Sequence, residues 1–147
     1  MNVYGDWWNS TITLYNKVTE ANGKVKWYRH VLDDCFYSHT LDKVTVNNTT
    51  ISSDVSICRI RVSDDFVPKR EYDALPEEEK VSKFTLSVGD IIVPEECEFE
   101  IDEYEKGKRS SDLKNTYKAY PGCFTADTVS INVGGGRGNE HYLARGV

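Results

Sequence analysis

Short segments in which polar and apolar residues alternate recur along the chain, and turn-forming residues separate them. Successive side chains of a strand point to opposite faces of a sheet, so alternation with a period of two predicts strands with one buried face. The clearest such segment is residues 55–62, and residues 11–16 and 43–47 show the same pattern. Several short strands separated by turns predict a mainly β fold, either a small β-barrel or a sandwich, with one or two short helices and extended loops or arms.

The first hairpin is predicted around Asn22 and Gly23, because Asn-Gly favours the two-residue turns that join antiparallel strands. Residues 24–32, rich in aromatic and β-branched side chains, return as the second strand. Residues 35–40 continue that strand after a bulge at residues 33–34.

A second hairpin is predicted at the C-terminal end of the chain, where residues 123–133 and 141–145 pair with each other. Glycines dominate its tip, residues 134–138, and glycine permits the backbone conformations of tight turns. Elsewhere, the polar run of residues 48–53 predicts a loop between two strands.

Helical signals are short and few. Residues 64–83 are expected to form a loop with one helix that begins at Pro76, since proline suits the first turn and the acids after it suit the positive end of a helix. Residues 110–117 predict a second short helix with a serine cap. The apolar residues 91–93 predict a buried strand that stops at Pro94.

The 147 residues have the usual length of one domain, and no shift in composition divides residues 1–147. The net charge of −6 argues against a surface that mainly neutralises nucleic-acid phosphates. Most of the acids fall within residues 64–105, where they predict a solvated polar face, with an acidic rim or lumen as the alternative.

The chain starts without the basic and apolar regions of a signal peptide and has no apolar run of the ~20 residues that cross a membrane. We therefore expect no membrane association and a reducing cytoplasm. The four cysteines form no Cys-x-x-Cys pair and are expected to be reduced and mostly buried.

No pattern of catalytic, cofactor-binding or metal-ligating residues is present, so none is expected in the protein. His30, His39 and His141 are far apart in the sequence, and no Gly-x-Ser-x-Gly elbow occurs. The adjacent aspartates at 33–34 and 64–65 would point to opposite faces of a strand. A small hydrolase or lyase remains the competing class, and it would need His30 or His39 beside a buried carboxylate in a cleft.

Candidate contact residues for other protein chains lie in three places. The N-terminal arm, residues 1–10, carries two adjacent tryptophans that cannot both face one core in an extended segment. The polar loop and the glycine-rich tip supply the others, and the full set is Trp7, Trp8, Asn47, Asn48, Thr49 and Arg137.

Several motifs spread in order over most of the chain resemble one family: Ile12-Thr13-Leu14-Tyr15-Asn16, Ser53-Asp54-Val55, Arg59-Ile60-Arg61-Val62, Gly89-Asp90-Ile91-Ile92-Val93, Ser111-Asp112-Leu113-Lys114, Val129, Asn132, Arg137-Gly138 and the segment from His141 to Gly146. This family consists of small proteins encoded among the head-to-tail joining genes of tailed bacteriophages and prophages of Gram-positive hosts. The chain is similar, in particular, to the stopper proteins of the neck.

The resemblance implies a structural virion protein that is not an enzyme. It implies a small β-barrel that assembles in the host cytoplasm as a twelve- or six-fold ring, joins the portal and adaptor to the tail, and helps to retain packaged DNA. A loop such as residues 47–53, or the tip at 134–138, would then close the channel. A minor capsid protein, another tail-completion protein and a monomeric binding module are the alternatives.

Overall fold

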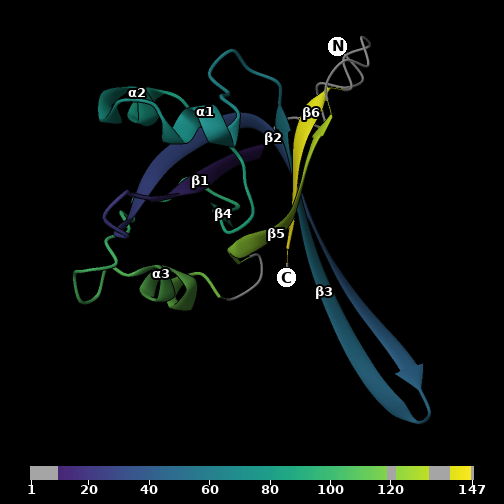
Figure 1. Ribbon diagram of the computed structural model, residues 1–147. Helices are drawn as coiled ribbons and strands as arrows, with labels where there is room; N and C mark the ends of the chain where they lie inside the picture. The colour runs from purple at the N-terminus through teal and green to yellow at the C-terminus, as the bar shows by residue number, and fades with distance from the viewer. Residues whose placement is uncertain (1–9, 119–121, 133–139, 147) are drawn as a thin grey trace.

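The computed structural model describes residues 10–118, 122–132 and 140–146. Within them, antiparallel strands form a closed barrel in the order β1-β2-β3-β6-β5-β4 (Figure 1). The fold is mainly β, as expected, and of the two expected architectures it is the barrel rather than the sandwich. The strands are β1 (Ser10–Thr19), β2 (Val25–Val46), β3 (Thr49–Arg61), β4 (Ile91–Val93), β5 (Phe124–Asn132) and β6 (His141–Gly146).

The first hairpin and its bulge are confirmed. Gly23 has a φ of 84° in the turn between β1 and β2, a conformation that glycine adopts at little cost. Ser10 is paired with Cys35 but Ile12 with Leu32, so β2 carries an extra residue at this point. Asp34, with a φ of 57°, lies in the bulge.

The loop expected over residues 48–53 is wrong, because β3 begins at Thr49. Only Asn47 and Asn48 form the turn, with φ values of 51° and 64°. Positive φ at two successive residues is typical of a type I′ turn, which asparagine tolerates and which matches the twist of a hairpin. The threonine, isoleucine and serine residues that follow pair with β2, and this pairing satisfies the backbone groups on the side of β3 that faces β2.

Three short helices occur in the described chain: α1 (Lys69–Asp73), α2 (Glu77–Ser82) and α3 (Ser110–Thr116). The helices predicted near Pro76 and at residues 110–117 are confirmed, but residues 64–83 hold two helices instead of one. The predicted serine cap of α3 is wrong, because the helix is capped at Arg109, whose N–H donates to the Asp112 carboxylate at 3.0 Å. The extra helix follows Pro68 as α2 follows Pro76, and the buried Tyr72 holds it against the barrel. None of the described helices has the length and apolar character needed to span a membrane.

The barrel interior holds the main hydrophobic core. Alternate residues of β1, Ile12 and Leu14, point inward together with Ile92 of β4. Phe66 stacks on Tyr142 of β6 with 3.9 Å between ring centroids. The other buried members come from β2, β3, β5, β6 and residues 84–86: Cys35, Cys58, Ile60, Phe84, Leu86, Phe124, Ala126 and Ala144.

A second, outer core explains why residues 91–93 are apolar without alternation. Tyr15 of β1 and Ile91 and Val93 of β4 face outward and pack beneath a layer that includes Leu113 of α3. The same layer is tied to β1 by Thr13, whose hydroxyl donates to the Glu95 carbonyl at 2.7 Å. The predicted buried strand is confirmed, because β4 is covered on both faces.

The cysteines agree with the expectation of reduced, mostly buried thiols. Cys35, Cys58 and Cys97 are buried and Cys123 is half-buried, and all four are free. Burial raises the pKa of the Cys35 thiol to about 12, so this side chain stays a neutral core residue.

Candidate functional site

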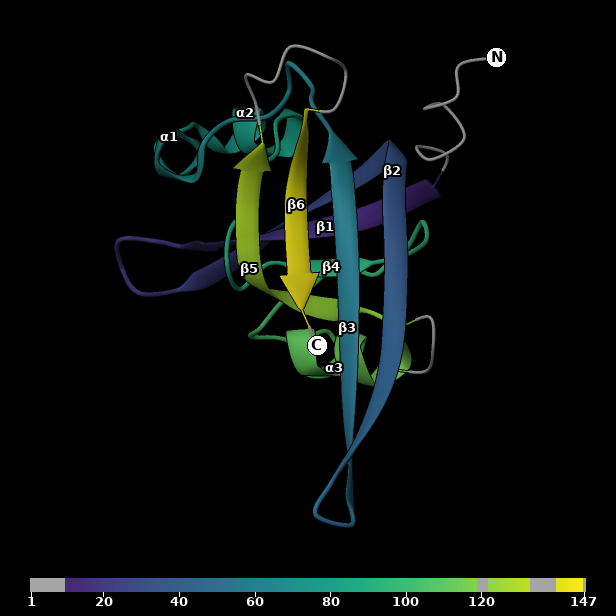
Figure 2. The same ribbon diagram turned by 90° about the vertical axis from the view of Figure 1, so that its right-hand side faces the viewer.

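The most distinctive feature of the molecule is a two-stranded ribbon that projects from the barrel, here called the arm (residues 40–55). Figures 1 and 2 show β2 and β3 continuing together well beyond the other strands. β1 is paired with β2 only as far as Cys35, and β6 is paired with β3 only from Ser56 onward. Among the described strands, the two strands of the arm therefore pair only with each other.

The tip of the arm carries three of the candidate contact residues. Asn47, Asn48 and Thr49 are exposed and lie at the far end of the ribbon from the barrel. The other three, Trp7, Trp8 and Arg137, lie outside the described residues. The structure thus places half of the predicted set on one projecting element.

The base of the arm is anchored to the barrel by polar and aromatic contacts. His39 Nδ1 lies 2.8 Å from the hydroxyl of Ser56, which is buried. Tyr37 donates its hydroxyl to the Gly122 carbonyl at 3.5 Å, and its ring lies 6.2 Å from that of Phe124. These contacts fix the direction in which the arm leaves the barrel.

His30 is a structural residue, not part of an acid–base pair. Its Nε2 lies 3.2 Å from the Tyr72 hydroxyl, which donates to the Lys80 carbonyl at 2.7 Å. Because the tyrosine proton is used in that bond, His30 must carry its own proton on Nε2 and donate it. Burial lowers the pKa of His30 to about 4, so the imidazole is neutral at pH 7.

The competing hydrolase or lyase would need His30 or His39 beside a buried carboxylate. His30 meets Tyr72 and Phe84 rather than a carboxylate, and His39 meets Ser56. The described residues also contain no group of histidine, cysteine and acidic side chains able to hold a metal ion.

A buried carboxylate does occur, but it is used to fasten the chain. Asp90 is fully buried and accepts hydrogen bonds from the Asn16 side chain and from the backbone N–H groups of Lys17 and Ser87. Burial raises the pKa of Asp90, and these hydrogen bonds oppose the rise. The network attaches the turn before β4 to β1.

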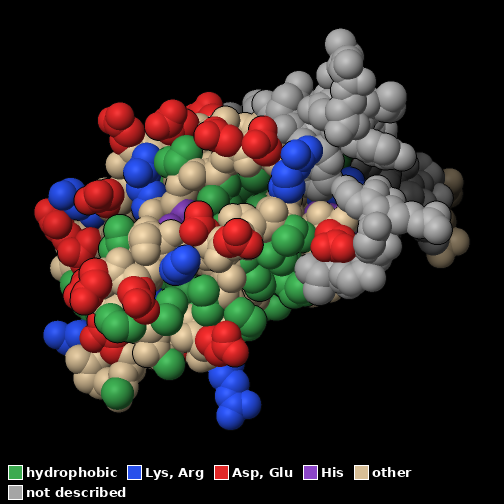
Figure 3. Space-filling view, turned by 90° about the horizontal axis from the view of Figure 1, so that it is seen from above, with side chains coloured by type: hydrophobic (Ala, Val, Ile, Leu, Met, Phe, Trp, Pro, Cys, Tyr) green, Lys and Arg blue, Asp and Glu red, His purple; other side chains and the backbone are tan. Residues whose placement is uncertain are grey.

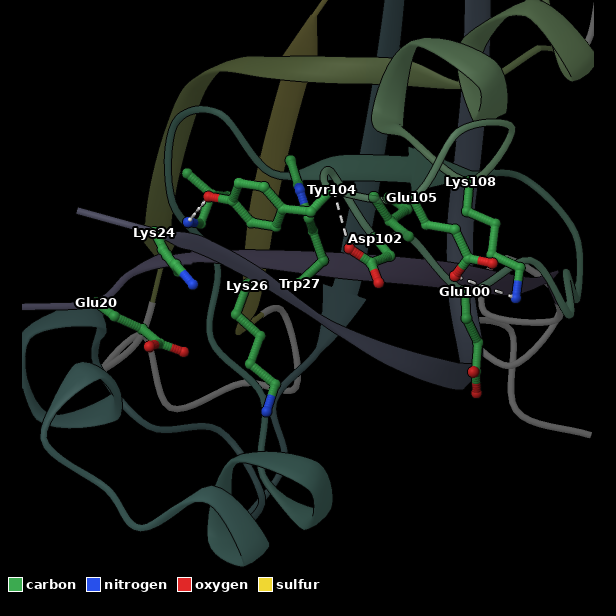
Figure 4. Close-up of a pocket in the computed structure, with 11 residues that line it drawn as sticks. Glu20, Lys24, Lys26, Trp27, Glu100, Asp102, Tyr104, Glu105 and Lys108 are labelled. Atoms are coloured by element: carbon green, nitrogen blue, oxygen red, sulfur yellow. Dashed lines mark hydrogen bonds and ion pairs between the residues drawn. The ribbon is translucent and has the colours of Figure 1, made fainter. Parts of the chain in front are cut away.

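A hollow of about 420 Å³ lies between the β1–β2 turn and residues 100–108 (Figure 4). Tyr104 accepts a hydrogen bond there from the Val25 N–H at 2.9 Å, and Lys108 pairs with Glu105 at 3.6 Å. Its lining mixes charges of both signs and has no histidine or cysteine; the charged residues are Glu20, Lys24, Lys26, Glu100, Asp102, Glu105 and Lys108. Such a lining does not form a single-signed site for an ion.

The acidic residues of the described chain lie mainly on the surface. Glu77, Glu78 and Glu79 are exposed on α2, as are Glu95 and Glu96 after β4. Figure 3 shows acidic side chains scattered over one face and interspersed with hydrophobic and a few basic ones. Their exposure agrees with the predicted solvated polar face and equally with the alternative of an acidic rim or lumen.

The comparison that decides the family is a match to a family model over residues 7–147. The chain belongs to a family of unknown function, DUF6751. The matched span covers the whole barrel and the arm together, so both are parts of the family's domain. No curated protein and no solved structure matches the chain.

The sequence patterns predicted the strand over residues 43–47 but not the arm as a whole. The polar run after Asn48 looked like a loop, although it consists largely of threonine, isoleucine and serine. A usable signal was present: the Asn47-Asn48 pair stands between two runs of β-prone residues, the arrangement of a tight hairpin.

Proposed function

We propose that the protein is a structural component of the head-to-tail junction of a tailed bacteriophage, a stopper-like ring protein that joins portal or adaptor to tail. Several copies form the ring, with the barrel as the wall. The arm of each copy reaches into the central channel and helps to retain the packaged DNA.

The observation that carries this proposal is the arm itself. A compact barrel of this size needs no such projection for its own stability, since the three hydrophobic cores of the described residues lie within the barrel and its outer layers. A two-stranded ribbon is at best marginally stable in water, so it is expected to acquire a partner. In a ring of barrels whose arms point inward, the arms of the other copies are such partners at the centre.

Three further features support a structural role. The described residues hold no cluster able to bind a metal ion. The exposed acids of the barrel would repel DNA phosphates and so favour sliding over binding if they faced a channel. The ordered motifs that resemble neck proteins fall on β1, β3, β4, α3, β5 and β6.

The experiment shortens the arm without touching the barrel. His39 and Ser56 are paired across β2 and β3, so an Asn-Gly turn in place of residues 40–55 closes a shorter hairpin. In the genome that encodes the protein, this variant should give filled heads that lose DNA, seen by electron microscopy and by assay of protected DNA. Circular dichroism of the purified variant checks that the barrel folds.

The matched control is Asn48→Gly, which keeps the arm and suits its left-handed φ of 64°. Control particles should retain their DNA. Full DNA retention by particles of the shortened variant would contradict the proposal, as would the absence of the wild-type protein from purified particles.

A further inference from the structure

The arm has two open edges. Residues 40–46 of β2 are hydrogen-bonded to β3 on one side, and residues 49–55 of β3 are hydrogen-bonded to β2 on one side. No other strand of the described chain pairs with either edge. Each edge therefore presents a row of backbone N–H and C=O groups able to accept another strand.

The two edges lie at the same level along the arm and run in opposite directions. Thr45 is paired with Thr50 near the tip, and Leu41 with Asp54 nearer the barrel. A second copy turned about an axis parallel to the arm can place its β3 edge beside the β2 edge of the first without any shift along the axis. The new pair is antiparallel, like the pair within one chain.

The sequence of the arm leaves these edges able to pair. Residues 40–55 contain no proline, which would remove a backbone donor. Their only charged residues are Asp42, Lys43 and Asp54, which limit uncontrolled association without closing either edge. Pairing also supplies the additional strands that a two-stranded ribbon needs for stability in water.

We propose that the arms of successive copies pair edge to edge, β2 of one with β3 of the next, and close into one antiparallel β-barrel at the centre of the ring. Each copy contributes two strands to it. This inference rests on the ring of the proposed function and names the partner of the arm, a second copy of the same chain. The contact is heterologous, and repeating it by rotation without a shift along the axis gives a closed ring.

The test is disulfide cross-linking between copies of the full chain. Two proteins are made in a Cys123→Ser background, which removes the half-buried thiol. One carries Thr45→Cys and the other Thr50→Cys, at positions that are paired within a chain. Under oxidised glutathione, the mixture should form disulfide dimers at least about ten-fold faster than either protein alone, because ring neighbours hold the two thiols at high effective concentration.

Val88→Cys mixed with Thr45→Cys is the control, because Val88 is exposed and lies outside the arm, in the segment before β4. Mass spectrometry of the linked peptides identifies the joined strands. If Thr45→Cys alone formed cross-links as fast as the mixture, β2 of one copy would be paired with β2 of another, and the inference would be overturned. A mixture that reacts no faster than the control at every protein concentration would also overturn it.

The inference and the proposed function fail in different ways. If particles lose DNA when the arm is shortened but no Thr45–Thr50 cross-links form, the neck role is supported and the central barrel is rejected. Cross-links in the purified protein, together with full DNA retention by the shortened variant, would retain the edge pairing and reject the neck role.

Discussion

The strands β2 and β3 contribute to both the barrel and the arm, but they are stabilised in different ways in the two regions. In the barrel, β2 and β3 are flanked by β1 and β6, and side chains such as Cys35, Cys58 and Ile60 are buried in a shared core. In the arm, the same strands have only each other. The same pair of strands therefore forms part of a barrel around a core and also a two-stranded ribbon that no further strand flanks. We expect function in the ribbon, because it is the less stable of the two regions.

The largest difference between the two regions is expected from side-chain truncations, one in the barrel and one in the arm. Leu14→Ala removes a fully buried side chain from the barrel core and should lower the free energy of unfolding by about 2–5 kcal/mol. Thr49→Ala, at the exposed tip of the arm, should change it by no more than about 0.5 kcal/mol. Urea unfolding measures both. A comparable loss from the two variants would mean that the arm is part of the cooperative core.

A pH titration probes the barrel alone. The pKa of folded His30, about 4, lies below the value of about 6.5 of an unfolded histidine, so the unfolded chain binds the proton more readily. Stability should therefore fall as the pH drops from about 6.5 to about 4, by at most about 3 kcal/mol. Urea unfolding at successive pH values measures this loss. The chain with the shortened arm should show the same loss.

His30→Gln serves as the control for that titration, because glutamine can still donate a hydrogen bond to Tyr72 but does not titrate. Asp90 also titrates, in both proteins. The difference between wild type and this variant in the pH dependence of the free energy of unfolding therefore reports His30 alone. A wild-type profile that remains parallel to the His30→Gln profile would contradict the assignment.

The smallest effect is expected at the turn of the arm. Asn48→Gly relieves a left-handed residue, yet it should change the free energy of global unfolding by less than about 0.5 kcal/mol, because the arm opens without the barrel. Thermal unfolding of the purified variant measures this. A clear rise in the midpoint would show that the arm and barrel unfold together.

Local signals predicted those parts of the fold that local physics determines. Asn22-Gly23, the bulge at residues 33–34 and the helix after Pro76 each depend on a few neighbouring residues, and each was correct. The α1 helix has five residues and is held by Tyr72 against the barrel, a contact between distant segments that no local pattern announces.

The arm was missed for a related reason. Alternation predicted the first strand of the arm over residues 43–47, but residues 49–53 show no such alternation and were predicted to form a loop, so the pairing of the two strands was missed. The residues of the tip were nevertheless predicted, because polarity and turn propensity at Asn47 and Asn48 are local properties. Whether Trp7, Trp8 and Arg137 belong to the same surface stays a prediction.

The continuity of β2 has a mechanical consequence. This single strand runs from the β1–β2 turn through the bulge to the tip of the arm. A load applied along the arm, such as pressure from DNA, would be carried along the backbone into the β1–β2 and β3–β6 hydrogen-bond ladders. Those ladders would be loaded in shear, with many hydrogen bonds sharing the force at once, rather than opened one bond at a time.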